Sequence, residues 1–260
     1  MSKSKKTYII GNWKMNPKTS IEAETIFSTL QSLYTPNPKL SVVVCPPVIF
    51  LGDLEAVNTK NNIHIGSQDV FWEKIGKKIT TYTGEIALEQ LKDSKVDTVI
   101  VGHSERRALG ESAHVVALKV EAVTSFGMNA VLCIGETTRD ASGDYFSVVK
   151  EQLVSALKNI PPAHMKRVRI AYEPVWAIGD GGEAIRTHDM HEMSIYIRKT
   201  LIDLFDTHIA SRTPILYGGS VTRENAEMLM KEGQVDGFLI GRASLDPAHF
   251  IDILSLVKNI

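Results

Sequence analysis

Three ionisable side chains follow apolar, strand-like runs at points where a packed core would need none. Lys14 lies two residues past a strand end, His103 begins a run of five polar residues, and Glu173 directly follows a buried-type run. A carboxylate at the end of a buried strand is poorly solvated when ionised, which makes it a plausible general base near neutral pH. A histidine ahead of a possible helix turn faces free N–H groups, which disfavour the imidazolium. Together the three residue types indicate acid–base chemistry.

Lys14, His103 and the nearby Glu105 also have purely structural interpretations. Taken alone, Lys14 is better interpreted as a solvated loop lysine. A strand-end histidine such as His103 is often a core residue whose hydrogen bonds are satisfied within the protein. Glu105 stands next to Arg106 and Arg107, so a structural ion pair is as reasonable for it as a role in chemistry. The residues alone leave these alternatives open.

An apolar connection punctuated by glycines follows Glu173. An exposed apolar loop is unfavourable unless it closes over something, so the pattern predicts a lid with hinges. The alternative is an ordinary hydrophobic connection between a strand and a helix. The lid residues are Pro174, Val175, Trp176, Ala177, Ile178 and Gly179, with more glycines at Gly181 and Gly182.

Glycines also follow two later strand candidates, at Gly218-Gly219 before Ser220 and at Gly241 before Arg242. Because glycine lets main-chain N–H groups approach an anion closely, such loops suit phosphate. A phosphate site after the seventh and eighth strands is a recurring feature of parallel barrels. The two loops together predict one here.

Eight short, β-branched runs alternate with segments of helical period and must position these side chains. Near-continuous apolar runs suit strands covered on both faces, and the capping box at Thr19–Glu22 marks the first helix. Eight units without a linker predict a closed (β/α)8 barrel, with a doubly wound open sheet as runner-up. In the barrel, the loops after all eight strands face one mouth. The strand candidates are Tyr8–Asn12, Ser41–Cys45, Ile63–Gln68, Asp97–Gly102, Ala130–Gly135, Arg169–Glu173, Ile215–Gly218 and Gly237–Ile240.

Composition sets further bounds. With 29 basic and 30 acidic residues in 260, the net charge of -1 excludes a polyanion binder that works by bulk electrostatics. No apolar run reaches the ~18 residues of a membrane span, and the basic start lacks the apolar stretch of a signal peptide. Cys45 and Cys133 lie in apolar runs and are expected to be buried free thiols of a reducing compartment. We expect a single domain over 1–260, with 1–6 as a flexible N-terminal extension.

Five strings, in order along most of the chain, resemble the triosephosphate isomerase family, whose fold is the TIM barrel. The string around Glu173 is specific enough to identify the family almost unaided. The strings are Gly11-Asn12-Trp13-Lys14-Met15-Asn16, Gly102-His103-Ser104-Glu105-Arg106-Arg107, Cys133-Ile134-Gly135-Glu136, Ala171-Tyr172-Glu173-Pro174-Val175-Trp176-Ala177-Ile178-Gly179 and Tyr217-Gly218-Gly219-Ser220-Val221.

The resemblance implies interconversion of dihydroxyacetone phosphate and glyceraldehyde 3-phosphate, in glycolysis and gluconeogenesis, without metal or cofactor. It implies that Glu173 is the base, that His103 is a neutral electrophile, that Lys14 and Asn12 stabilise the enediolate, and that Glu105 supports Lys14. The implied phosphate ligands are main-chain N–H groups of Gly179, Ser220, Gly241 and Arg242. In the family, Tyr217 and Ser220 latch the closed lid, and Trp176 with Glu136 belongs to its open position.

The resemblance further implies a cytoplasmic homodimer that takes a small sugar phosphate. In the family the third loop, here residues 69–85, reaches into the partner subunit, so Thr83 and Gln68 are expected at the dimer contact. Nucleic acid is not an expected partner, since no basic stripe or aromatic platform occurs. A membrane is not expected either, since no apolar run is long enough to span one.

The chain departs from the family pattern in three places. Residues 180–183 read Asp-Gly-Gly-Glu where Thr-Gly-Lys-Thr is usual, Arg242 replaces a glycine, and Ala108-Leu109 replaces aromatic residues. If the position of Arg242 needs a positive φ, the arginine costs ~1 kcal/mol. The altered lid leaves an isomerase of a related four-carbon sugar phosphate as an alternative. A third reading is a non-catalytic phosphate-binding barrel.

Overall fold

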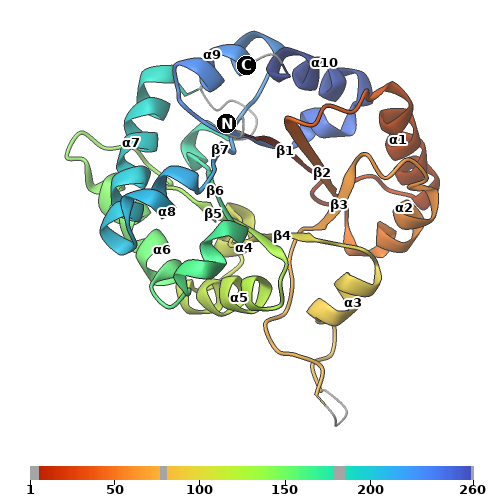
Figure 1. Cartoon of the computed structure of the whole chain (residues 1–260), viewed down its shortest axis with the longest axis horizontal. Helices are drawn as coiled ribbons and strands as arrows, with labels where there is room; N and C mark the ends of the chain where they lie inside the picture. The colour runs from red at the N-terminus through yellow and green to blue at the C-terminus, as the bar shows by residue number, and fades with distance from the viewer. Residues whose placement is uncertain (1–5, 77–80, 179–184, 259–260) are drawn as a thin grey trace.

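Eight parallel strands pair in chain order and close into a barrel in the computed structural model, which describes residues 6–76, 81–178 and 185–258 (Figure 1). The first strand pairs with the second and with the last, so the sheet has no free edge. The predicted (β/α)8 barrel is confirmed. The strands are β1 (Thr7–Asn12), β2 (Leu40–Cys45), β3 (His64–Ser67), β4 (Thr98–Val101), β5 (Asn129–Ile134), β6 (Val168–Tyr172), β7 (Ile215–Tyr217) and β8 (Gly237–Ile240).

Helices surround the barrel in the order of the strands they connect (Figure 1). They are α1 (Ser20–Leu33), η1 (Val48–Phe50), α2 (Leu51–Val57), α3 (Leu88–Asp93), α4 (Ser104–Ala108), α5 (Ala113–Ser125), α6 (Asp144–Leu157), η2 (Pro162–Arg167), η3 (Val175–Ala177), α7 (Thr187–Leu204), α8 (Thr207–Arg212), α9 (Arg223–Lys231), η4 (Arg242–Leu245) and α10 (Pro247–Val257).

Two apolar layers follow from the near-continuous hydrophobic strands. Because successive side chains of a strand point to opposite faces, one set fills the barrel and the other packs under the helices. The inner layer is small and includes both cysteines, which are free and buried as expected. Its members are Ile10, Val43, Cys45, Ile100, Val131, Cys133, Ala171, Leu216 and Leu239.

Helix α1 shows how the sequence signals operate. The hydroxyl of Thr19 accepts the N–H of Glu22 at 3.2 Å, as the predicted capping box requires. The return bond differs, because the Glu22 carboxylate accepts from the N–H of Lys18 at 3.0 Å. Ala23 and Phe27 are buried, as the predicted apolar face requires.

The predicted strands match the observed ones to within one residue at each end. Glu173 and Gly218 were expected as strand residues but lie just beyond β6 and β7. The ladder nevertheless continues one step, since Glu173 N–H donates to Ile134 O at 2.7 Å and Gly218 N–H to Tyr172 O at 2.8 Å. Apolar runs therefore mark the strands well, while their last residue depends on where the chain turns away.

Two regions outside the barrel wall complete the description. The connection between β3 and α3 projects well away from the barrel (Figure 1). Of the extension predicted at 1–6, only Lys6 lies within the described residues, and it is exposed. Within the described part of the chain, no helix is both long and apolar enough to cross a membrane.

Candidate active site

A cavity of about 520 Å³ opens at the carboxyl ends of the strands and brings the predicted residues together. Gly179, which is also predicted to bind phosphate, lies outside the described residues. Glu105 does not line the cavity and instead contacts Lys14 from the side. The predicted residues that line it are Asn12, Lys14, His103, Glu173, Ser220, Gly241 and Arg242.

Glu173 is buried, with only 2% of the residue exposed, and its carboxylate is held from two sides. Its Oε2 accepts the main-chain N–H of Ser104 at 3.0 Å, and its Oε1 lies 3.0 Å from His103 Nε2. Two glycines make room for it, because a Cβ on Gly218 would come within 2.8 Å of Glu173 Cγ, and one on Gly135 within 1.8 Å of Glu173 O. The carboxylate is therefore fixed in place and directed at the cavity.

The two ring nitrogens of His103 have different partners. Nδ1 accepts the N–H of Glu105 at 3.2 Å, so it carries no proton in this geometry, and Nε2 carries the proton and faces Glu173. Burial lowers the pKa of His103, but the charge and hydrogen bond of Glu173 and the charge of Glu105 outweigh it, so the pKa is raised. The Glu105 N–H, in contrast, favours the neutral ring.

Lys14 is fixed through its main chain. Its φ of 53° is unusual for a side-chain-bearing residue, and its N–H donates to Asn12 Oδ1 at 3.0 Å. The Gln68 amide donates to Lys14 O at 2.7 Å and to Cys45 O at 3.0 Å, which ties the loop after β1 to the ends of β2 and β3. Gln68, expected at a dimer contact, thus positions a site residue of its own chain.

The structure shows which charged group Glu105 contacts. Its Oε1 lies 2.6 Å from Lys14 Nζ, while the neighbouring arginines turn elsewhere. Arg106 pairs with Asp69 at 3.2 Å, and Arg107 donates to Gly102 O at 2.8 Å. Glu105 therefore contacts a site residue rather than its neighbouring arginines.

Arg242 is accommodated without the strain that a positive φ would cause. It begins η4 and is absent from the positive-φ residues of the described chain, which are Lys14, Asn61, Lys95 and Gln234 besides glycines. The turn is secured by Ser244, whose N–H and hydroxyl donate to Gly241 O at 2.9 and 2.7 Å. Trp13 Nε1 in turn donates to Ser244 O at 3.1 Å, which links the loops after β1 and β8.

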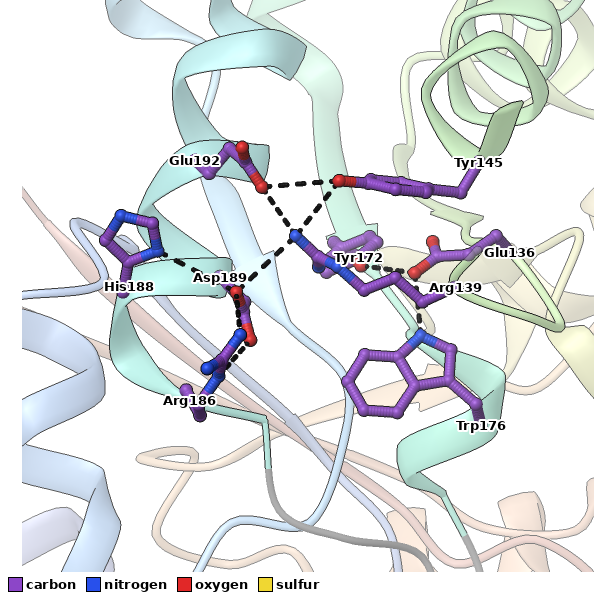
Figure 2. Close-up of polar contacts among 9 residues, drawn as sticks. All are labelled: Glu136, Arg139, Tyr145, Tyr172, Trp176, Arg186, His188, Asp189 and Glu192. Atoms are coloured by element: carbon purple, nitrogen blue, oxygen red, sulfur yellow. Dashed lines mark hydrogen bonds and ion pairs between the residues drawn. The ribbon is translucent and has the colours of Figure 1, made fainter. Parts of the chain in front are cut away.

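The chain leaving Glu173 is held by Glu136 (Figure 2). Glu136 Oε1 accepts from the Tyr172 hydroxyl at 2.7 Å and from Trp176 Nε1 at 2.8 Å. Its carbonyl accepts from Val175 N–H at 3.0 Å. One residue thereby fixes the positions on both sides of Glu173.

Sequence reasoning missed a cluster beside Glu136. Arg139 pairs with Glu192 at 2.5 Å and with Asp189 at 3.6 Å, and Arg186 chelates Asp189 (Figure 2). Arg139 lies in the polar segment past the end of β5, so its position relative to the strand is a signal for it. Nothing in the spacing points to Asp189, which is one polar residue among several on a helix.

The chemistry available here is that of a carboxylate base, an N–H donor and an ammonium group around one cavity. Among the residues that the structure describes, no group of three or more His, Cys, Asp or Glu could hold a metal ion. The arrangement is suited to moving a proton next to a carbonyl, where negative charge develops on oxygen.

Comparison with known proteins agrees with this geometry. A family model described as triosephosphate isomerase matches residues 7–257. A curated triosephosphate isomerase of Coprinopsis cinerea is 37% identical over 253 residues, which covers 96% of this chain and 98% of that protein.

Proposed function

The chain belongs to the triosephosphate isomerase family, and we propose that Glu173, His103 and Lys14 perform its reaction at the barrel mouth. That reaction interconverts dihydroxyacetone phosphate and glyceraldehyde 3-phosphate, an aldose–ketose isomerisation of glycolysis. The observation that carries the assignment is the 3.0 Å contact between the buried Glu173 carboxylate and His103 Nε2. One group can take a proton from carbon while the other serves the adjacent oxygens.

Each step of the isomerisation has a candidate residue. Glu173 removes a proton from C1 of dihydroxyacetone phosphate, and the electron pair moves to the C2 oxygen to form an enediolate. His103 Nε2–H and the Lys14 ammonium stabilise this oxygen, with Asn12 beside them. His103 exchanges protons between the two oxygens, and Glu173 returns its proton to C2, which completes the aldose. The resident groups are regenerated.

The phosphate end of the substrate fits the part of the cavity formed by the loops after β7 and β8. Ser220, Gly241 and Arg242 line it after β7 and β8, where main-chain N–H groups favour an anion. The predicted lid begins in the described residues 174–178 and continues through Gly179 outside them. Exclusion of water by such a segment would protect the enediolate from losing phosphate.

We also propose that the chain forms a homodimer through the region around Gln68. The connection from β3 to α3 projects from the barrel, and Tyr82 beside Thr83 is 48% exposed (Figure 1). Met15 at 93% and Ile49 at 74% exposure are large apolar groups left uncovered. Sedimentation equilibrium should give twice the chain mass for the unmodified protein and a monomer for Met15→Asp. An unmodified protein that sediments as a monomer would exclude the dimer.

We further propose a cytoplasmic location, with which the two buried free thiols agree.

The reaction and the base are tested together by isomerisation of glyceraldehyde 3-phosphate in a coupled assay. Glu173→Asp withdraws the carboxylate by one methylene and should lower turnover by ~10²-fold or more through misplacement alone. Glu227→Asp, an exposed acid paired with Lys231 on α9, is the matched control and should be unaffected. Full activity in Glu173→Asp would remove Glu173 from the mechanism. No turnover in the unmodified chain, followed by turnover of a four-carbon sugar phosphate, would favour the alternative substrate.

A further inference from the structure

We propose that Arg139 and Asp189 are positioning residues for Glu173, an inference that rests on the proposed function of the mouth. Neither residue lines the cavity, so any effect on the reaction must pass through other groups. Arg139 lies on the loop after β5, and Asp189 lies in the first turn of α7. Their contact joins the loop beside Glu173 to helix α7.

The end of β5 and the loop after it contact the main chain of Glu173. Glu173 N–H donates to Ile134 O, and Gly135 lies against Glu173 O so closely that no side chain fits. Glu136 then holds the residue before Glu173 and the residues after Pro174. A displacement of this loop therefore moves the base itself.

Arg139 anchors the loop after β5 through contacts with residues outside that loop. Its side chain is 17% exposed, and its guanidinium lies 4.5 Å from the centre of the Tyr145 ring. One nitrogen contacts Glu192 Oε2 at 2.5 Å, Asp189 Oδ1 at 3.6 Å and the Tyr145 hydroxyl at 3.3 Å (Figure 2). A guanidinium is suited to this role because its rigid donors fix geometry as well as charge.

Asp189 provides the fixed point on α7. Its side chain is 9% exposed and accepts two bonds from Arg186, at 2.7 and 3.0 Å. Burial raises the pKa of Asp189, but the hydrogen bonds and charges of Arg186 and Arg139 outweigh it, so the pKa is lowered and the carboxylate stays ionised. An acid in the first helical turn also suits the helix dipole. Asp189 is therefore a rigid, charged anchor rather than a solvated side chain.

The expected signature separates positioning from general stability. The described residues proposed to bind phosphate, Ser220, Gly241 and Arg242, lie after β7 and β8. Arg139 contacts residues of α6 and α7 instead, so its loss should displace the base with little effect on substrate binding. Arg139→Met should lower kcat ~10- to 100-fold and leave KM within about twofold. Arg139→Lys, which retains the charge, should recover part of the loss. Asp189→Asn should act in the same direction, and the double variant should be no worse than Arg139→Met.

The matched control is Arg198→Met. Arg198 lies on α7, as Asp189 does, but it pairs with Asp236 at 3.5 Å at the other end of the barrel. It should lower the Tm at least as much as Arg139→Met while leaving kcat unchanged. Unchanged kcat in both Arg139→Met and Asp189→Asn, or an equal loss in Arg198→Met, would overturn the positioning role. If Arg139→Met does not fold, Asp189→Asn gives the same comparison. Absence of isomerisation in the unmodified chain would instead overturn the proposed function.

Discussion

The two ends of the barrel use similar polar side chains with different partners. At the amino-terminal end, Asp236 accepts the Ile215 N–H at 2.9 Å, and Arg198 donates to Thr213 O at 2.6 Å. These two partners are main-chain groups of the barrel and its connections, and the two side chains also pair with each other at 3.5 Å. Neither main-chain partner can be exchanged for another molecule without breaking the fold.

At the carboxyl end, the principal charged contacts join one side chain to another beside a cavity. Lys14 meets Glu105, and His103 meets Glu173, and three of these four residues line the space a substrate would occupy. A substrate can replace a side-chain partner by rotation of that side chain. Burial and charge are thus common to both ends, and exchangeable partners distinguish the end at which we propose the reaction takes place.

The largest expected effect is at the mouth and leaves stability nearly untouched. His103→Gln keeps a hydrogen-bonding group but loses the ring that faces Glu173 at 3.0 Å. Losing one preorganised donor to an oxyanion should lower kcat by ~10²- to 10³-fold. Steady-state kinetics of the purified variant, with its Tm, provide the measurement. A fall in Tm with little change in kcat would place His103 with the structural groups instead.

A slightly smaller effect, of the opposite kind, is expected at the amino-terminal end. Asp236→Ala leaves the buried Ile215 N–H and the Arg198 guanidinium without this carboxylate. Removing one member of a buried pair should cost about 3 kcal/mol of unfolding free energy, measured by urea titration. The kcat per folded molecule should not change. Glu227→Ala, an exposed acid on α9, should stay within ~0.5 kcal/mol of the unmodified chain. A kinetic defect in Asp236→Ala would show that the two ends are not independent.

The sequence predicts the barrel and the mouth because both depend on simple patterns. Eight apolar runs separated by helical segments allow few folds, and polar residues past strand ends must then meet at one mouth. That rule makes Glu173, His103 and Lys14 candidates, the resemblance to the family implies their roles, and all three line the cavity. The identity of residues at strand ends therefore carries most of the functional information.

The contacts that orient these residues could not be predicted in the same way. The Gln68 amide reaches two carbonyls across three strands, and the Ser104 N–H reaches Glu173 from a different loop. Asp189 contacts Arg139 on the loop after β5 and Arg186 just before α7. Such contacts depend on how loops pack against each other. The hydrophobic periodicity of the sequence predicts helices and strands but not the packing of loops.

The smallest expected effect concerns the charge of His103 and separates the influence of Glu173 from that of burial. Burial lowers the pKa of His103, while the charge and hydrogen bond of Glu173 raise it, with Glu105 adding to the rise. Glu173→Gln removes the largest raising influence, so the ring pKa should fall. Chemical shifts of the His103 ring followed against pH provide the direct measurement. A ring pKa that is the same in both proteins would show that Glu105 and the surrounding main chain, rather than Glu173, set its charge.

The same change should appear in stability with a definite sign. A histidine whose folded pKa is raised stabilises the fold fully below its unfolded pKa, ~6.5, and that contribution is lost as the pH rises through the folded value. Urea titrations between about pH 5 and pH 8 should therefore show the unmodified chain losing stability relative to Glu173→Gln as the pH rises. Glu227→Gln, which removes an exposed carboxylate paired with Lys231, should follow the unmodified chain at every pH. Because Glu173 is a partner that substrate can displace, this pH dependence should shrink when a substrate analogue fills the mouth, and no such change is expected for the Asp236 contacts.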